Sequence, residues 1–383
     1  MMNPKIRFKK SDGSDYQDWK VDNINELFGI STGKCITTAE ADADGLYDVI
    51  SGGTKPLCKT NKYNRNANTI TVARAGTAGY VMFQTNDFYL NDKCFSLIPI
   101  DENIIDSKFG FYELKNREYD IIRLKTDNVV PTINTVSLGS VKVYYPTDIE
   151  EQTKIANFLS EIDNLIASAE HEVESTKQLK KAMLQKMFPK KGEKFPEIRF
   201  PEFTDAWEQR KFSDFAQRES AVQLSSYDCP CVEYEDVIAE EGRLNKDILQ
   251  KEVQKSGIKF DGTQVLYGKL RPYLHNWLNP DFTGVAVGDW WVLRPIGIDK
   301  NYLYRLIQTK QFDDVANQST GSKMPRADWN LVSNTEFFIP ASMEEQSKIA
   351  MTFTNLDTLI TLHQRKLDAY KKFKKAMMQK MFV

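Results

Sequence analysis

Residues 150–156 read EEQTKIA, and residues 344–350 read EEQSKIA. A second stretch, KKAMLQKMF at residues 180–188, returns as KKAMMQKMF at residues 374–382, at the same offset. Two matches at one offset mean that no residue was gained or lost between them. The chain therefore carries a tandem duplication, and the repeated stretches mark its organisation.

The repeated stretches are predicted to be two long helices. Their apolar residues recur at steps of three and four and so fall on one stripe. Residues 342–345 (SMEE) follow Pro340 and have the pattern of a capping box, which marks a helix start. At 1.5 Å per residue, about 40 residues give a rod roughly 60 Å long. The residues expected to pack along the stripes are Ile155, Leu159, Ile162, Ile166 and Val173 in the first helix, and Ile349, Phe353, Leu356, Ile360 and Leu367 in the second.

The two helices are expected to pair with each other, because a lone helix cannot bury its apolar stripe. The pattern leaves the sense of the pair open. An antiparallel coiled coil is favoured because each globular region immediately precedes its helix. His363 falls on the stripe of the second helix, and we interpret it as a register-setting or partly exposed residue rather than a catalytic one.

The rest of the chain is predicted to form two globular regions of mixed α/β class. A length of 383 residues suggests two or three domains at roughly 150 residues each. Alternating runs such as residues 69–74 and 290–293 predict short strands separated by turns. The expected boundaries are 1–147 for the first globular region, 148–189 for the first helix, 190–341 for a linker and the second region, and 342–383 for the second helix.

Composition is that of an ordinary globular protein, with 41% hydrophobic and 27% charged residues. The five cysteines are scattered and form no disulfide framework, so a reducing cytoplasm is expected. Neither a secretory signal nor an apolar run of membrane-spanning length is recognisable. The three histidines make a structural metal site improbable. The net charge of −2 argues weakly against a nucleic-acid partner.

The distribution of charge argues the other way, because three windows hold cations and no acids. They are residues 49–86, 262–280 and 315–327, which we interpret as loops. A single lysine there is as well explained by a solvated loop, but three such windows in two related regions favour DNA contact. The expected DNA-binding residues are Lys55, Lys62, Arg65, Arg74, Thr77 and Tyr80 in the first region, and Lys269, Arg271, Tyr273, Lys323 and Arg326 in the second.

Signatures of catalysis are missing from the sequence. There is no G-x-G-x-x-G, and residues 262–269 imitate a P-loop with one residue too many and with Leu270 in place of Ser or Thr. Residues 279–282 (NPDF) lack the second proline of the amino-methyltransferase motif. No catalytic residue and no resident cofactor or metal is therefore expected in this chain.

The repeated motifs resemble the conserved helices of the specificity subunit of type I restriction–modification enzymes. The resemblance includes the EEQ openings, the middles IDNLI and LDTLI at residues 162–166 and 356–360, and the KKAM closings. GKLRPY at residues 268–273 and GSKMPR at residues 321–326 resemble motifs inside that family's target-recognition domains. PEIRF at residues 196–200, followed by Trp207, resembles the entry to that family's second target-recognition domain. One departure is that four extra residues separate Phe8 from Trp19 at the start of the chain, compared with Phe200 to Trp207.

The resemblance implies two target-recognition domains that each read one half of a split double-stranded DNA site. It implies that the paired helices set the gap between the halves and dock methyltransferase subunits, expected to be two. Those subunits would bring S-adenosylmethionine and methylate adenine, and a restriction and motor subunit would use ATP and magnesium. The alternative is a coiled-coil scaffold that binds proteins, which explains the helices but not the three cationic windows.

Overall fold

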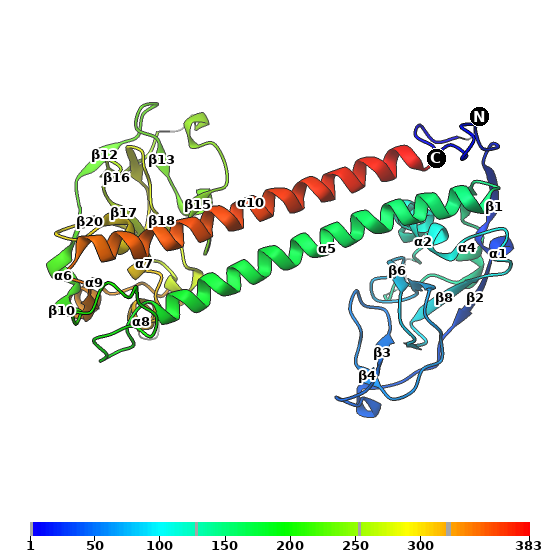
Figure 1. Ribbon diagram of the computed structural model, residues 1–383, viewed down its shortest axis with the longest axis horizontal. Helices are drawn as coiled ribbons and strands as arrows, with labels where there is room; N and C mark the ends of the chain where they lie inside the picture. The colour runs from blue at the N-terminus through cyan, green and yellow to red at the C-terminus, as the bar shows by residue number, and fades with distance from the viewer. Residues whose placement is uncertain (1–2, 127–128, 252–253, 319–322) are drawn as a thin grey trace. The chain divides into compact units, whose positions relative to one another are not determined.

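The computed structural model describes residues 3–126, 129–251, 254–318 and 323–383 and divides into two compact units. The first unit comprises Met1–Glu170 with Arg365–Val383, and the second comprises His171–Gln364. Both predicted helices are present and are long (Figure 1). Each of them passes from one unit into the other, so each unit contains one segment of both helices. They are α5 (Ile149–Lys186) and α10 (Met343–Met381).

The first unit is built around a four-stranded antiparallel sheet in the order β2-β8-β5-β6. A smaller sheet, β4-β3-β7, lies beyond it, and β1 pairs with β9 to close the region before α5. The bounds are β1 (Lys20–Asn23), α1 (Ile24–Leu27), β2 (Phe28–Thr32), η1 (Thr38–Glu40), β3 (Tyr47–Ile50), β4 (Lys59–Thr60), β5 (Thr69–Ala73), β6 (Val81–Gln84), β7 (Tyr89–Leu90), β8 (Cys94–Pro99), α2 (Ser107–Asn116), α3 (Glu118–Ile122), α4 (Thr135–Gly139) and β9 (Lys142–Tyr145).

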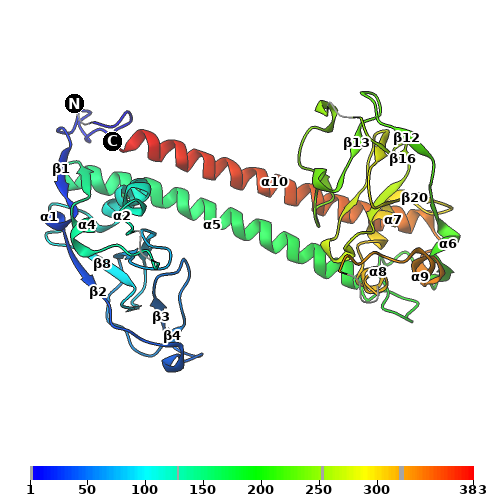
Figure 2. The same ribbon diagram turned by 180° about the vertical axis from the view of Figure 1, so that it is seen from behind.

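The second unit repeats this plan with different residues. Its central sheet has the order β11-β20-β17-β18, and β12, β16 and β13 belong to a second four-stranded sheet (Figure 2). The bounds are β10 (Glu208–Lys211), α6 (Phe212–Phe215), β11 (Ala216–Arg218), β12 (Val222–Leu224), β13 (Cys231–Val232), η2 (Tyr234–Asp236), β14 (Val237–Ile238), β15 (Arg243–Leu244), η3 (Ile248–Gln250), β16 (Ser256–Phe260), β17 (Val265–Gly268), η4 (Pro272–Leu274), β18 (Trp277–Leu278), β19 (Gly284–Ala286), β20 (Trp290–Pro295), α7 (Lys300–Leu306), α8 (Lys310–Ala316), α9 (Trp329–Asn334) and β21 (Glu336–Ile339).

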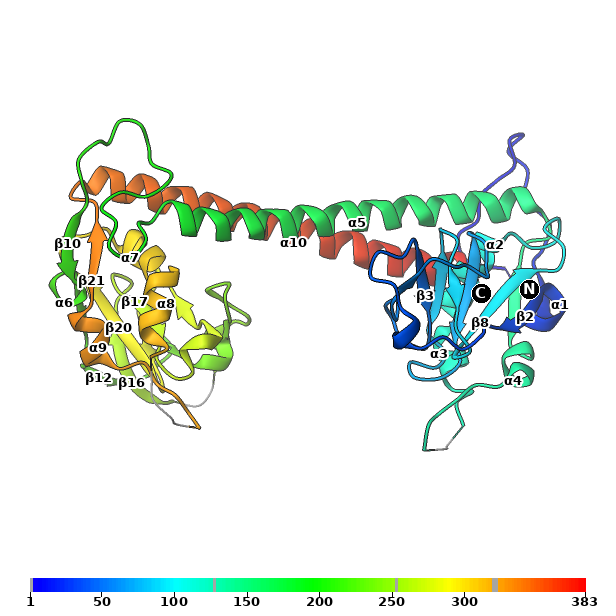
Figure 3. The same cartoon turned by 90° about the horizontal axis from the view of Figure 1, so that it is seen from below.

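Equivalent strand pairs confirm that the two units share one architecture. The first strand of each region pairs antiparallel with the last, β1 with β9 and β10 with β21, the latter pair visible in Figure 3. The central pairs also correspond, since β5 meets β8 at Ala73 and Cys94 while β17 meets β20 at Gly268 and Trp290. The mixed α/β class predicted from short alternating runs is correct.

The description of the cationic windows as loops is wrong for much of their length. The first window contains β4, β5 and β6, and the second contains β17 and β18. Every residue of Thr69–Ala73 is buried, because both faces of this central strand are covered. The cations of these windows therefore lie at strand ends and turns, not along continuous loops.

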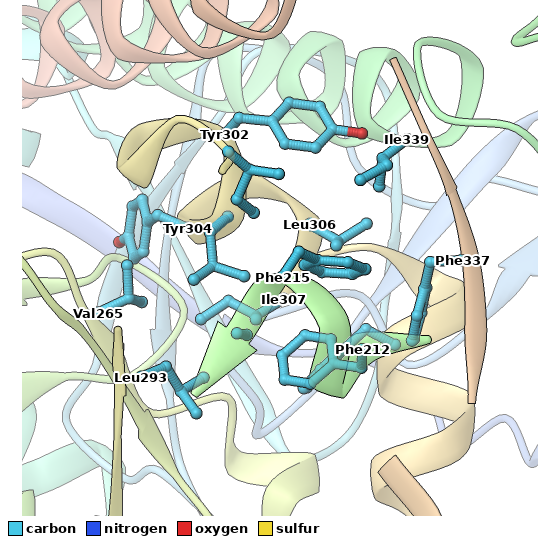
Figure 4. Packing of buried hydrophobic residues seen from close by; sticks show 14 of the residues in the cluster. Phe212, Phe215, Val265, Leu293, Tyr302, Tyr304, Leu306, Ile307, Phe337 and Ile339 are labelled. Atoms are coloured by element: carbon cyan, nitrogen blue, oxygen red, sulfur yellow. The ribbon is translucent and has the colours of Figure 1, made fainter. Parts of the chain in front are cut away.

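The core of the second unit gathers aromatic side chains from several elements, among them α6, α7 and β21 (Figure 4). Phe212 packs edge-on to Phe215 within α6, with ring centroids 5.3 Å apart. Tyr302 of α7 and Phe337 of β21 complete the same cluster. Because these side chains come from both ends of the region, the core closes only when β10 and β21 are paired.

The helix segments run antiparallel within each unit. In the first unit, Asp163 of α5 meets Lys374 of α10 at 2.5 Å, and Glu170 meets Lys371 at 2.7 Å. Residue numbers rise along one helix as they fall along the other, which defines the antiparallel sense. In the second unit, Lys180 meets Asp357 at 2.6 Å and Glu172 contacts the His363 ring at 2.9 Å.

The EEQ motif attaches each helix to its own globular region. Glu345 of α10 is 2% exposed and accepts two hydrogen bonds from the Arg199 guanidinium, at 2.7 and 2.9 Å. Arg7 and Glu151 form the same bidentate pair in the first unit, at 2.9 and 2.8 Å. The capping-box prediction is therefore half wrong. The Ser342 hydroxyl accepts from the Glu345 N–H at 3.3 Å, but the Glu345 carboxylate is taken by Arg199.

The closing motif of each helix enters the core of the opposite region. Phe382, at the end of α10, packs on Trp19 and Phe109 of the first unit with centroids 6.2 and 5.7 Å apart. Phe188, just after α5, packs on Trp207 of the second unit at 6.3 Å. The repeated KKAM stretch thus contributes core residues as well as helix, which explains why both copies end in Met-Phe.

Candidate functional site

The second and third cationic windows meet in the second unit, although they are far apart in sequence. Leu270, just after β17, forms an antiparallel bridge with Arg326, just before α9. The Arg271 N–H donates to Pro325 O at 2.7 Å, and the Ala327 N–H donates to Lys269 O at 2.8 Å. We call this meeting of residues 269–271, Asp289 and residues 325–326 the strand-end site of the second unit.

The first unit builds the equivalent strand-end site from Arg74, Ala75, Lys93 and Thr132. Ala75, just after β5, bridges Thr132 ahead of α4. The Arg74 N–H donates to Lys93 O at 2.9 Å, as the Lys269 N–H donates to Asp289 O at 2.9 Å. The same backbone hydrogen bonds therefore occur in both units. The residue whose carbonyl accepts the bond is a cation, Lys93, in the first unit and an anion, Asp289, in the second.

Asp289 organises the cations of the second strand-end site. Its Oδ1 and Oδ2 accept from Nε and Nη2 of Arg326 at 3.1 and 2.9 Å, and Lys269 Nζ lies 3.5 Å from Oδ1. These cations, with Arg326 first, lower the pKa of Asp289. The DNA-binding residues predicted from the sequence do not include Asp289 or Lys93. The cationic windows were defined by their lack of acidic residues, so they exclude Asp289, and the first window ends at residue 86, before Lys93.

Arg271 and Tyr273 project from a strained turn beside this site. The backbone of Arg271 has φ 48° and that of His275 has φ 53°, a left-handed conformation that costs free energy for residues with a Cβ. Arg271 is exposed, and Tyr273 is 53% exposed. Lys323 is also exposed, whereas Gly321 and Ser322 of the same predicted motif lie outside the described residues.

His275 fixes the end of the turn. Its Nε2 lies 3.0 Å from Asp313 Oδ1 on α8, and its Nδ1 lies 3.3 Å from Glu240 Oε1. The ring stacks on Trp277 with centroids 5.3 Å apart. Hydrogen bonding to Asp313, followed by the effect of Glu240, raises the pKa of His275 above its ordinary value.

We expect His275 to stabilise the second unit in a pH-dependent way. Because its folded-state pKa is raised, this stabilisation is fully present below the unfolded-state value of about 6.5 and is lost as pH rises through the folded-state pKa. The difference in unfolding free energy between wild type and His275→Gln should therefore be largest at low pH and shrink as pH rises. Denaturant unfolding over a pH series measures it, and a pH-independent difference would contradict a charged ring.

Three of the predicted residues of the first unit have partners inside the fold. Arg65 donates from Nε to Ser96 Oγ at 2.8 Å and from Nη2 to Thr32 O at 3.1 Å. The Thr77 hydroxyl donates to Gly52 O at 2.8 Å, within a turn where a Cβ on Gly52 would lie 2.1 Å from Ala75 O. Lys115 Nζ lies 4.1 Å from the centroid of the Tyr80 ring.

The other three cations predicted to bind DNA in the first unit, Lys55, Lys62 and Arg74, are exposed to solvent. Arg74 is exposed at the strand-end site, with its guanidinium 6.0 Å from the Phe95 ring centroid. Lys55 and Lys62 are exposed on the segments before and after β4, and in the sequence both precede β5, the strand that leads to the strand-end site. The fold therefore brings Arg74 and Lys93 together by direct backbone contact, whereas no such contact joins Lys55 or Lys62 to them among the described residues.

The predicted stripe residues of the helices are all buried or half-buried. His363 is half-buried and contacts Glu172, consistent with a residue on the seam that is partly exposed. The buried stripe residues are Ile155, Leu159, Ile162, Val173, Ile349, Phe353 and Leu367, and the half-buried ones are Ile166, Leu356 and Ile360.

Within the described ranges, no group of three or more His, Cys, Asp or Glu side chains is arranged to hold a metal ion. All five cysteines are free thiols, and burial raises the pKa of Cys94 to about 12. No helix among the described residues combines the length and apolarity needed to cross a membrane.

A comparison with family models matches this chain twice to the type I restriction modification DNA specificity domain, at residues 16–178 and 205–371. A putative type I specificity subunit of Mycoplasma pneumoniae is 27% identical over 49% of this chain and 48% of its own length. The chain thus spans about half the length of the first curated relatives that it matches. The MjaVIII specificity subunit of Methanocaldococcus jannaschii is 23% identical over 94% of this chain and 91% of its own.

The fold is also similar to solved structures. The crystal structure of the S subunit of a type I restriction-modification system from M. genitalium superposes with a TM-score of 0.71 at 17% identity, covering 100% of this chain and 99% of that one. A structure from a study of the assembly of a type I system superposes with a TM-score of 0.54 at 11% identity, over 96% and 98% of the two chains.

Proposed function

Because the chain belongs to the type I restriction modification DNA specificity domain family, we propose that it is the DNA specificity subunit of a type I restriction–modification complex. Each unit reads one half of a bipartite double-stranded DNA site. The chain supplies sequence recognition and performs no chemistry. The observation that carries this proposal is the pair of equivalent strand-end sites, one in each unit, with different side chains on the same backbone.

The difference between the two sites supports two unlike half-sites. The first offers Arg74 and Lys93, which are both exposed cations. The second offers Arg326 and Lys269 held by Asp289, with Arg271 beside them. Because base edges differ in their donors and acceptors, two such sets of side chains select different bases.

The helices serve as spacer and docking surface in this proposal. They fix the gap between the half-sites, and they bind methyltransferase subunits, two to each chain. Apolar side chains that remain exposed on the helices support docking, and they are Leu165, Leu179, Met343, Met351, Leu359, Leu362 and Phe373. The docked subunits carry S-adenosylmethionine and methylate adenine, and restriction and motor subunits that use ATP and magnesium join the same complex.

Salt dependence of binding tests the DNA-binding part of this proposal. Phosphate contacts release counterions, so affinity for a duplex should fall steeply between 50 and 200 mM salt, by roughly a thousandfold if six phosphates are contacted. Titration of a fluorescent duplex with the full chain at several salt concentrations measures the slope. A chain that binds methyltransferase subunits but shows no salt-dependent DNA binding would instead support the scaffold alternative.

A further inference from the structure

We propose that Asp289 is a positioning residue for specificity, which holds the Arg326 guanidinium so that its outer N–H donors face a guanine in one half of the DNA site. This inference rests on the proposed function and assigns one residue pair to one base. It concerns only the strand-end site of the second unit, where Asp289 forms salt bridges with both Lys269 and Arg326.

The geometry of the pair leaves the right donors free. Arginine carries five N–H donors in a planar fork. Nε and one N–H of Nη2 are used by Asp289, at 3.1 and 2.9 Å. The outer edge, formed by Nη1 and the second N–H of Nη2, remains, and Arg326 is 49% exposed on its side chain. Guanine presents O6 and N7 side by side in the major groove, which matches such a two-donor edge.

The backbone around Arg326 is also held in place. Arg326 bridges Leu270, and the neighbouring Pro325 accepts the Arg271 N–H at 2.7 Å. The Tyr234 hydroxyl donates to Asp289 O at 2.6 Å and accepts from the Leu270 N–H at 3.0 Å. The guanidinium is thus fixed at both ends before DNA arrives, which reduces the entropy lost on binding.

The negative charge of Asp289 favours a base over a phosphate as the acceptor. Its carboxylate is 25% exposed, so it would repel a phosphate brought up to Arg326, whereas a guanine edge is uncharged. The first unit shows the contrasting arrangement, because Lys93 replaces Asp289 there. Among the residues that the structure describes, no salt bridge joins Lys93 or Arg74 to a carboxylate, so no anion orients either cation in the first unit.

The test is Asp289→Asn in the full chain, compared with wild type by selection from duplexes with randomised half-sites. We expect one guanine position in one half-site to lose at least about fivefold of its preference, while the other half-site is unchanged. Affinity for random DNA should stay the same or rise, because a negative charge has been removed. The control Glu208→Gln makes the same charge change on β10, outside the strand-end site, and should leave every preference intact.

A second variant separates positioning from folding. Arg326→Lys keeps the charge but lacks the planar fork, so it should relax the same guanine position, and the double variant should lose no more than either single one. Uniform loss of affinity on all sequences would make Arg326 a phosphate contact and would overturn the inference. A wild type that selects a bipartite sequence which Asp289→Asn leaves unchanged contradicts this inference alone. A wild type that selects no sequence contradicts the proposed function as well.

Discussion

Replacing Arg199 by alanine is expected to lower the stability of the second unit by about 3–5 kcal/mol. The Glu345 carboxylate is 2% exposed and would lose both hydrogen bonds from the guanidinium, keeping only the Trp207 indole N–H at 3.1 Å. An uncompensated buried charge is costly because it has given up water without gaining a counterion. Denaturant unfolding followed by tryptophan fluorescence measures the loss.

The tryptophans of the chain report on the unfolding of each unit, and a lysine on the same helix offers a control variant. Five of the six tryptophans lie in the second unit, and Trp19 alone reports on the first. Lys348 also lies on α10, and Lys348→Ala removes its solvent-exposed ion pairs with Glu202 and Glu344, so it should leave stability unchanged within error. Hydrogen exchange should show that Arg199→Ala loosens the second unit, and that Arg7→Ala loosens the first. Equal stability of Arg199→Ala and wild type would contradict the role of Arg199 and Glu345 as a stabilising buried ion pair.

Replacing Arg271 by alanine is expected to cost about 1–3 kcal/mol of discrimination in one half-site and none in the other. Arg271 is exposed on the strained turn after β17, and its backbone N–H is fixed by Pro325. Such a side chain reaches outward from a rigid base, as direct reading of a base edge requires. Binding to duplexes that carry single changes in each half-site measures the effect.

Arg74→Ala is the reciprocal variant, because Arg74 occupies the equivalent strand end of the first unit. It should affect only the half-site that Arg271→Ala leaves intact. An effect of either variant on both half-sites would contradict the assignment of one half-site to each unit. Equal loss on every sequence would instead make the altered residue a phosphate contact, since phosphates carry no sequence information.

The long helices could be predicted because the spacing of their apolar residues is a local feature of the sequence, and the same motifs occur in both helices. Apolar residues at steps of three and four define a helix without reference to the rest of the chain. The partner of the EEQ motif could not be predicted in this way. Arg199 and Glu345 are separated by 146 residues, and a carboxylate three residues after Ser342 also fits a capping box. Only the fold shows that the distant arginine binds it.

The sequence could predict which cations belong to the candidate site, but it could not predict how the fold brings them together. Arg271 and Arg326 were found from charge, but their meeting depends on a bridge between segments on either side of β20. Arg65 has the same sequence signal, yet its guanidinium bonds to Ser96 and to the Thr32 carbonyl inside the unit. Asp289 was missed because it lies beyond Asp281, the acid that ends the second window, and only the fold places it beside Lys269 and Arg326.

The measurement that most directly tests the central claim is a methylome. The chain is expressed with its companion methyltransferase subunit in a host free of DNA methylation, and N6-methyladenine is mapped by single-molecule sequencing. We expect a bipartite motif with two unlike halves at a fixed gap, methylated once in each half on opposite strands. A stable complex that adds no methylation, or one that methylates without regard to sequence, would contradict the assignment of this chain as the specificity subunit.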